Sequence, residues 1–252
     1  MKILAIEFSS EQRSAAVLDG NRLLAEQTVS AGRDTEAIRL IESALTQAQT
    51  GRQDIECIAV GVGPGSYTGI RTAIAITQGW QIAAEVKVQS IDSLEALAFG
   101  QQAMGERGGI TFAVDAARGE FYIAKFELED EGIKALEHTH LVKRREFEHL
   151  LNSESIIIGP SLEKNFSAAN DRYPAAKYVG IIASLPQAFF QEFTSRVTQS
   201  NGGLITILIE LVIWVVVIAL CVLLVKAVRQ VPVQYARRTA SGGFDKNQAS
   251  SR

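Results

Sequence analysis

Residues 61–71 read GVGPGSYTGIR and join two segments with different hydrophobic patterns. The preceding stretch, CIAVGV at residues 57–62, is continuously apolar and typical of a buried strand. The stretch from about residue 68 to 84 has helical spacing of its apolar residues and predicts a helix. Glycine and proline between a strand and a helix indicate a sharp turn. Such a turn either holds a phosphate group or only redirects the chain.

The loop lacks the residues that a nucleotide-phosphate loop requires. A Walker A loop ends in Gly-Lys, but counting from Gly63 those two positions hold Thr68 and Gly69. The dinucleotide fingerprint also fails, because Ser66 stands where its third glycine is needed. We therefore expect a strand-to-helix corner, with anion binding at the helix N-terminus as the alternative. The residues assigned to this corner are Gly63, Pro64, Gly65, Ser66 and Thr68.

The predicted helix after the loop carries small residues along one broad stripe. Glycine inside a helix costs about 1 kcal/mol relative to alanine, so a close approach by another element is expected to compensate. That element is either a partner chain or the chain's own sheet, and both interpretations stay open. The stripe consists of Gly69, Thr72, Ala73, Ile76, Gly79 and Ala83.

The sequence before the loop predicts three antiparallel strands and a helix. Apolar residues alternate over residues 2–8, and Asp19-Gly20 between two strand-like runs is a strong hairpin signal. A helix is predicted over residues 35–49, because Ile38, Ile41 and Leu45 recur at helical spacing.

The second half of the chain repeats this order of elements from about residue 111. Two strands are predicted around Arg118-Gly119 and a third after Gly132. A short helix (KRREFEHLL), a strand (SIIIGP) and a second helix over residues 161–170 (SLEKNFSAAN) follow. The doubled order of strand-strand-strand-helix-strand-helix predicts an α/β protein built from two similar halves.

Three stretches resemble the TsaB/YeaZ family of Gcp-like proteins in the actin/Hsp70-like ATPase superfamily. They read MKILAIEFSS (1–10), GVGPGSYTGIRTAIAITQGW (61–80) and AVDAARGEFYIAKFE (113–127). The resemblance covers residues 1–178 and implies a duplicated ribonuclease H-like fold, truncated at its C-terminal end. It divides into a first subdomain at 1–105 and an incomplete second subdomain at 106–178.

The resemblance also implies a function for residues 1–178. Members of this family are non-catalytic subunits that pair with TsaD, the enzyme that transfers a threonylcarbamoyl group to the adenosine beside the anticodon of certain tRNAs. The helices corresponding to residues 35–49 and 68–84 form the surface for self-association and TsaD binding. The residues expected in this partner interface are Ile38, Ile41, Leu45, Gly69, Thr72, Ala73, Ile76, Gly79 and Ala83. The expected partners are thus a TsaD-type subunit or a second copy, with tRNA reached only through the complex. The expected location is the cytoplasm.

No catalytic residue, cofactor or metal is expected in residues 1–178. ATP-using relatives keep an aspartate and a glycine-containing turn after their first strand, whereas this chain has Glu7-Phe8-Ser9-Ser10, and we expect bulky Phe8 to obstruct a phosphate. His138 and His140 share one strand face, as a metal pair could, but exposed strand histidines are ordinary. An ATP-dependent enzyme or Gcp-like peptidase is the alternative function.

Composition is consistent with an intracellular protein that does not bind nucleic acid directly. The 252 residues are 47% hydrophobic and carry a formal net charge of −3, with the basic excess confined to the end of the chain. Two cysteines, Cys57 and Cys221, are too few for a disulfide framework. The N-terminus has too short an apolar run for a signal peptide.

The end of the chain differs from everything before it. Residues 204–225 (LITILIELVIWVVVIALCVLLV) are long enough as a helix, about 33 Å, to cross a bilayer core. With VGIIASLPQAFF upstream and KAVRQVPVQYARR downstream, residues 179–252 resemble the fifth and sixth membrane helices and following cytosolic loop of the SecY translocation channel.

Two different resemblances that meet near residue 178 predict a fusion, with a membrane-tethered tail. Basic residues after the predicted span would place the C-terminal end in the cytosol. A single span would then put the TsaB-like half on the other side of the membrane, away from tRNA. A fragment of the translocation channel with a passenger domain is therefore a further alternative.

Overall fold

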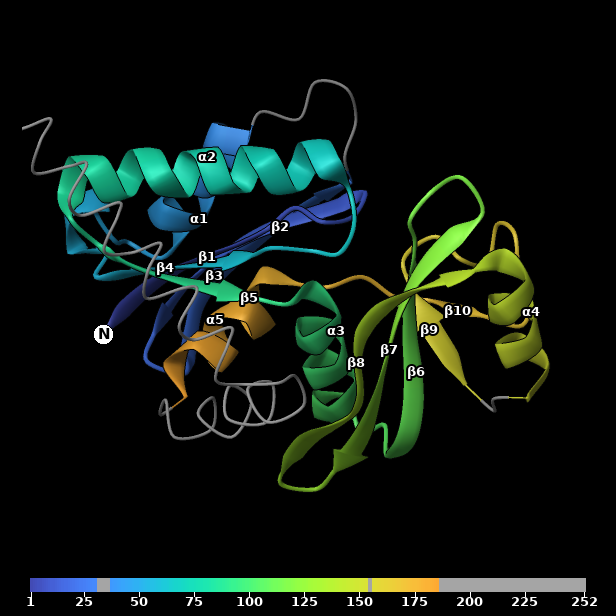
Figure 1. The fold of residues 1–252 in the computed structure, drawn as a ribbon. Helices are drawn as coiled ribbons and strands as arrows, with labels where there is room; N and C mark the ends of the chain where they lie inside the picture. Colours follow the sequence, from blue (N-terminus) through green and yellow to red (C-terminus); the bar gives the residue numbers. More distant parts are fainter. Residues whose placement is uncertain (31–36, 154–155, 186–252) are drawn as a thin grey trace, which may run out of the picture. The chain divides into compact units, whose positions relative to one another are not determined.

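The computed structural model describes residues 1–30, 37–153 and 156–185, and residues 1–185 form one compact unit. Figure 1 shows two β-sheets, each accompanied by helices. The elements of the first half are β1 (Lys2–Glu7), β2 (Gln12–Asp19), β3 (Arg22–Ser30), α1 (Ala37–Gln47), η1 (Arg52–Asp54), β4 (Cys57–Gly61), α2 (Tyr67–Ala84), β5 (Lys87–Ile91) and α3 (Ser93–Ala103). Those of the second half are β6 (Gly108–Asp115), β7 (Glu120–Glu129), β8 (Gly132–Lys143), α4 (Arg144–Ser153), β9 (Ile157–Gly159), β10 (Asn170–Asp171) and α5 (Ala176–Ser184).

The two sheets have the same strand order, which confirms the predicted duplication. The first runs β3-β2-β1-β4-β5 and the second, read from its other edge, runs β8-β7-β6-β9-β10. In both, three antiparallel strands joined by hairpins are followed by two parallel strands. The Asp19-Gly20 hairpin is present, and Gly20 adopts the positive φ of 59° that such a turn requires.

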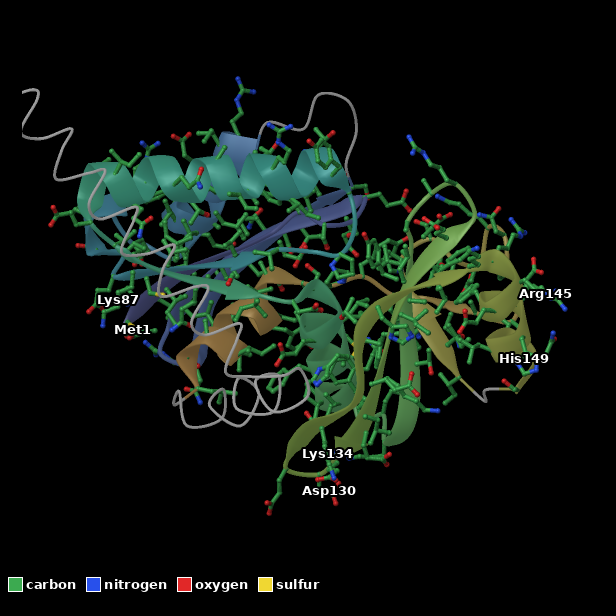
Figure 2. All side chains as sticks on the ribbon, in the orientation of Figure 1. Met1, Lys87, Asp130, Lys134, Arg145 and His149 are labelled. Carbon is green, nitrogen blue, oxygen red and sulfur yellow. The ribbon has the colours of Figure 1, made fainter. Side chains whose placement is uncertain are left out.

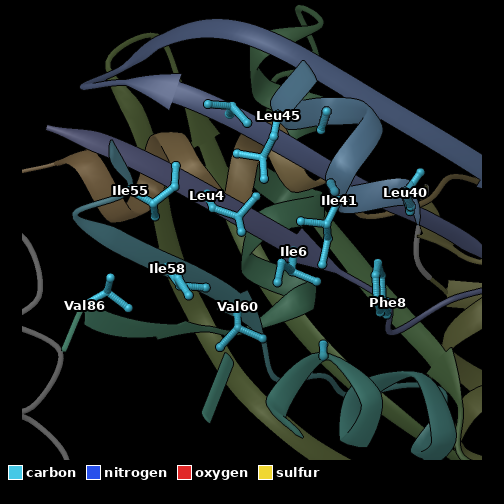
Figure 3. Packing of buried hydrophobic residues seen from close by; sticks show 14 residues of the cluster. Leu4, Ile6, Phe8, Leu40, Ile41, Leu45, Ile55, Ile58, Val60 and Val86 are labelled. Atoms are coloured by element: carbon cyan, nitrogen blue, oxygen red, sulfur yellow. The ribbon is translucent and has the colours of Figure 1, made fainter. Parts of the chain in front are cut away.

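The first sheet is covered by helices on both faces. Helices α1 and α2 lie on the face that carries Leu4, Ile6 and Phe8, and these side chains form one core cluster with Leu40 and Ile41 of α1 (Figure 3). Helix α5 covers the opposite face and contacts β1, β2 and β4. Because successive side chains of β1 point to opposite faces of the sheet, this strand contributes to two hydrophobic layers, one on each face.

The second sheet is also covered on both faces. Leu94 and Leu97 of α3 pack with Phe112 and Phe126 on one face. On the other face Phe147 of α4 stacks on Phe121 of β7, with ring centroids 4.1 Å apart. The predicted KRREFEHLL helix is present as α4, whose amphipathic pattern buries Phe147 completely.

The end of the compact unit differs from the prediction. The sequence assigned everything from residue 179 onward to the SecY-like segment, but α5 packs on the first sheet and the compact unit extends to Leu185. Val179 is fully buried, and a Cβ added to Gly180 would lie 2.3 Å from Leu18 Cδ1. The compact unit thus includes this apolar helix, which covers β1 and β2, and extends beyond the predicted boundary at residue 178.

Two further elements correct the sequence prediction. The stretch at 161–169 forms turns instead of the predicted helix, with Ser161 in the left-handed region at φ 57°. The sequence also failed to identify β5 and α3. Helices α1 and α2 begin and end within two residues of the predicted limits.

The predicted membrane span at residues 204–225 lies outside the described residues. Within residues 1–30, 37–153 and 156–185, none of the helices combines the length and apolar character of a transmembrane segment.

Candidate functional site

The glycine loop seats the first turn of α2 directly on the backbone that follows β1. A Cβ added to Gly69 would lie 1.9 Å from the Phe8 carbonyl oxygen, and one added to Gly65 would lie 2.0 Å from the Ser9 carbonyl oxygen. No residue other than glycine fits at either position without movement of the backbone. The loop is thus a tight corner, and its glycines permit contact between two backbone segments.

Hydrogen bonds fix the corner at both ends. The Ser66 amide donates to the Ser9 carbonyl at 2.6 Å, and the Ser66 hydroxyl caps α2 by accepting from the Gly69 amide at 3.3 Å. Gly63 adopts φ 92°, which favours glycine, and its amide donates to the Ser93 hydroxyl at 3.1 Å. Of the two hydroxyl residues assigned to the corner, Ser66 caps the helix, whereas Thr68 lies exposed in its first turn.

Glu7 connects the corner to the start of α3. Its fully buried carboxylate accepts from the Ser9 amide at 2.7 Å and from the Ser93 hydroxyl at 2.8 Å. Burial raises the pKa of Glu7, while the hydrogen bonds from Ser9 and Ser93 act in the opposite direction. A Cβ on Gly61 would lie 1.9 Å from Glu7 Oε2, so the carboxylate is enclosed by backbone. Glu7 thereby has a structural role at the join of β1, α2 and α3.

This arrangement corrects the role predicted for Phe8. Its side chain is fully buried in the core cluster under α1 and α2, so the ring does not face the turn after β1. What fills the space beside that turn is the backbone of the glycine corner itself. Nearby, Arg13 lies over the Phe8 ring, with its Cζ 5.7 Å from the ring centroid.

A group of acidic residues marks the N-terminus of α3. Asp92 caps this helix by accepting from the Leu94 and Glu95 amides, and it accepts from the Thr139 hydroxyl of β8 at 3.1 Å. Burial, reinforced by the charge of Asp92, raises the pKa of Glu95 to about 7. These residues were not predicted from the sequence, although Asp92 followed three positions later by Glu95 is a helix-start signal.

The small-residue stripe of α2 divides between two surfaces. Gly69 and Ala73 are buried against the chain's own sheet, and Ile76 is partly buried there. Assigning Gly69 and Ala73 to a partner interface is therefore wrong, because this side of the helix closes the first core. By contrast, Gly79 and Ala83 are exposed, and a Cβ on Gly79 would meet no atom within 4 Å.

The same division applies to Thr72 and to the residues predicted on α1. Thr72 is partly buried and bonds the Thr68 carbonyl of its own helix at 2.8 Å. Ile41 and Leu45 are buried in the first core, which corrects their assignment to an interface, whereas Ile38 is 51% exposed.

The outer face of α1 borders a shallow, open hollow. Its volume is about 560 Å³, and its lining residues are polar: Arg39, Glu42, Ser43, Thr46 and Gln47. Glu42 is paired with Arg52 of η1. The hollow offers hydrogen-bonding groups next to α1, but Glu7, Asp92 and Glu95 do not line it.

The remaining candidate groups are dispersed over the second half. His138 and His140 lie exposed on β8, where His140 Nδ1 is 2.9 Å from the His138 carbonyl, and His149 projects outward from α4 (Figure 2). Among the described residues, no three His, Cys, Asp or Glu side chains are grouped as a metal site would require. Asp115 shapes the β6–β7 turn by accepting from the Ala117 amide at 2.7 Å.

Comparison with known proteins identifies a matching family model and several similar proteins. A family model described as "TsaD: tRNA N6-adenosine threonylcarbamoyltransferase" matches residues 29–209, which is more than half of the chain. The chain is 31% identical over 164 residues to tRNA threonylcarbamoyladenosine biosynthesis protein TsaB of Escherichia coli, covering 63% of this chain and 71% of that relative. The TsaB of Bacillus subtilis is 29% identical over 129 residues, covering 50% of this chain and 56% of that relative.

A solved structure shows the same fold. YeaZ from Pseudomonas aeruginosa superposes with a TM-score of 0.64 at 21% identity, covering 75% of this chain and 93% of that chain. The superposition shows that both chains have the same two-sheet α/β fold.

The resemblance of residues 179–252 to SecY is supported by one family model over a short stretch. A second family model, SecY, matches residues 178–251, less than a third of the chain, and most of these positions lie outside the described residues. The predicted fusion stays a prediction. The relatives and the family model that matches residues 29–209 agree on a family other than SecY. The chain belongs to the TsaB/YeaZ family of Gcp-like proteins.

Proposed function

We propose that the chain is a non-catalytic subunit of the machinery that makes threonylcarbamoyladenosine in tRNA, and that it binds a TsaD-type catalytic subunit. Its partner contact is then the exposed side of α2 with the neighbouring exposed part of α1. The tRNA is reached only through the complex. This function accords with the names of the TsaB relatives from Escherichia coli and Bacillus subtilis.

The observation that carries the proposal is the closure of the glycine corner. Contact of Gly65 and Gly69 with the backbone of Ser9 and Phe8 occupies the space in which a phosphate would have to meet the turn after β1. The corner also has no lysine, and the nearest buried charged group, Glu7, is an acid that would repel phosphate. These features favour a binding subunit over an ATP-using enzyme.

The exposed side of α2 supports a partner contact. Tyr67 is 71% exposed and Ile82 is 85% exposed, so two large apolar side chains of one helix project into solvent. Exposed apolar groups gathered on one helix are a feature of protein interfaces.

The proposal is tested by replacing the TsaB gene of a bacterium with one that encodes this full chain and measuring threonylcarbamoyladenosine in its tRNA. Mass spectrometry of tRNA nucleosides is expected to show the modification restored. A matched variant, Gly69→Arg, keeps the chain length but disrupts the corner and is expected to lose it.

A parallel calorimetric titration separates the alternative function. Mg-ATP is expected to give no binding heat with the full chain alone. Absence of the modified nucleoside, together with tight Mg-ATP binding, would favour an ATP-dependent enzyme and contradict the proposal.

A further inference from the structure

The turn after β1 (residues 8–11) contacts the start of α2 and also the second half of the chain. Its Ser9 carbonyl accepts a hydrogen bond from the Ser66 amide at 2.6 Å. Its Glu11 side chain reaches the opposite way, to residues 161–173, which lie between β9 and α5. This short turn therefore links the second half of the chain to the first turn of α2.

Three side chains of the second half converge on the Glu11 carboxylate. The Tyr173 hydroxyl donates to Oε1 at 3.0 Å, and Lys164 Nζ lies 3.3 Å from both carboxylate oxygens. The Ser161 hydroxyl donates to the same Oε1. Hydrogen bonds to an ionised carboxylate are stronger than those between neutral groups. Glu11 is thus fixed to the second half, although its side chain is 47% exposed.

The segment that supplies these donors is anchored in the core of the second half. Leu162 is buried beside Phe147, and the Phe166 ring packs edge-on against Phe147 with ring centroids 5.2 Å apart. The segment is also closed on itself, because the Glu163 amide donates to Asp171 and the Asp171 amide donates to Glu163. The donors that hold Glu11 therefore move only with the second half.

Few backbone rotations separate Glu11 from the contact with α2. The Ser10 hydroxyl donates to the Gln12 carbonyl at 2.9 Å and accepts from the Gln12 amide at 3.2 Å, which closes the turn. The Ser9 amide donates to the buried Glu7 carboxylate at 2.7 Å. Because these bonds stiffen the turn, the position of Glu11 constrains that of the Ser9 carbonyl.

We propose that Glu11 is a positioning residue through which the second half of the chain holds the start of α2. Its carboxylate fixes the turn after β1, and the Ser9 carbonyl of that turn orders the first turn of α2 through Ser66. The inference rests on the proposed function in one respect, because α2 is the helix proposed to bind the catalytic subunit. It adds that this binding surface depends on contacts made outside α1 and α2.

Hydrogen exchange of the full chain in mild detergent, measured by mass spectrometry, tests the inference without any partner. The informative peptide spans residues 62–70 and contains the Ser66 amide and the start of α2. Glu11→Ala is expected to speed exchange in this peptide at least about fivefold, because the Ser9 carbonyl is no longer held against Ser66. A peptide from β6 is expected to keep its wild-type rate, which shows that the variant is folded.

Glu148→Ala is the matched control. Glu148 forms an ion pair with Arg144 inside α4 and is 48% exposed, close to the exposure of Glu11. Exposed ion pairs by themselves contribute little to stability, so the loss of such a pair is not expected to disturb a distant segment. The 62–70 peptide of this control is expected to exchange at the wild-type rate.

Exchanging the two charges provides a rescue. Glu11→Lys alone places two lysines together and is expected to speed exchange of the 62–70 peptide as Glu11→Ala does. Combining it with Lys164→Glu restores an ion pair at the same place and is expected to return the rate toward that of the wild type. The inference is overturned if Glu11→Ala leaves the rate unchanged, or if the double variant exchanges as fast as Glu11→Lys.

Calorimetric titration with a TsaD-type subunit separates this inference from the proposed function. A wild type that fails to bind the subunit would contradict the proposed function, while the exchange result would still stand. Where the wild type binds, Glu11→Ala is expected to bind about fivefold more weakly, because the start of α2 is less ordered. Equal affinity of the two proteins would overturn the link between Glu11 and the partner surface.

Discussion

Gly69 and Gly79 belong to the same helix but have opposite roles. Gly69 faces the Phe8 carbonyl, where an added Cβ would lie 1.9 Å away, whereas Gly79 faces open space. From the sequence both glycines were members of one small-residue stripe, and spacing alone could not separate them. The difference depends on the orientation of α2 on the first sheet, which is a property of the fold.

Alanine substitution at these two glycines is expected to change stability in opposite directions. Gly69→Ala forces α2 away from the turn after β1 and is expected to lower the free energy of unfolding by at least about 3 kcal/mol. Gly79→Ala removes backbone freedom from the unfolded chain and is expected to raise it by about 0.5–1 kcal/mol. Urea unfolding followed by circular dichroism measures both. Equal effects of the two substitutions would contradict the packing of the corner.

Glu95 is expected to make stability depend on pH. Burial, and then the charge of Asp92, raises the pKa of Glu95 from its ordinary 4.5 to about 7 in the folded chain. An acid whose pKa is raised by folding stabilises the protein fully below its unfolded pKa, and this contribution is lost as the pH rises through the folded pKa. The loss between about pH 4.5 and 7 amounts to about 3 kcal/mol.

The variant Glu95→Gln isolates this contribution because glutamine keeps the size of the side chain and cannot ionise. Subtracting its unfolding free energy from that of the wild type removes the contributions of Glu7 and Asp92, which both proteins share. The free energy of unfolding of the wild type is expected to fall relative to that of the variant as the pH rises from 5 to 8. Parallel curves over that range would show that Glu95 is not buried as described.

Helices and strands whose formation depends on short-range sequence patterns were predicted correctly. The alternation in β1 and the Asp19-Gly20 turn are short-range signals, and both the strands and the hairpin are confirmed. Strand β5 was missed because this short edge strand is mostly exposed and lacks an apolar pattern. Helix α3 was missed because it packs against the second sheet and also against α5. In the contact with α5, the ring centroids of Phe99 and Tyr178 are 6.2 Å apart. An apolar residue on almost every side of a helix hides its periodicity.

The position of α5 can be tested by placing a charge in its buried face. Val179→Asp is expected to lower the free energy of unfolding by at least about 3 kcal/mol, because an unpaired carboxylate would enter the layer beneath β1 and β2. Ile38→Asp, at a position 51% exposed in the first turn of α1, is expected to change it by less than about 1 kcal/mol. Thermal unfolding of the full-length variants compares them. If Val179→Asp left the free energy of unfolding unchanged, α5 would belong to the C-terminal segment and not to the compact unit.

For the whole molecule, the sequence predicted the doubled architecture and the sharp corner, but only part of the candidate interface. The duplication is visible in the order of elements, which needs no knowledge of tertiary contacts. The interface required the opposite information, namely which side of α2 and α1 the sheet covers. For that reason Ala73, Ile41 and Leu45 were assigned to a surface that the chain itself buries.

The proposed function requires that this chain binds a catalytic protein and does not act by binding nucleotide. The most direct test is a calorimetric titration of the full chain with a TsaD-type catalytic subunit in nucleotide-free buffer. The proposed function predicts saturable binding of one catalytic subunit per chain, with a dissociation constant of about 10 µM or lower. Absence of binding heat with both proteins folded and at about 100 µM would contradict it.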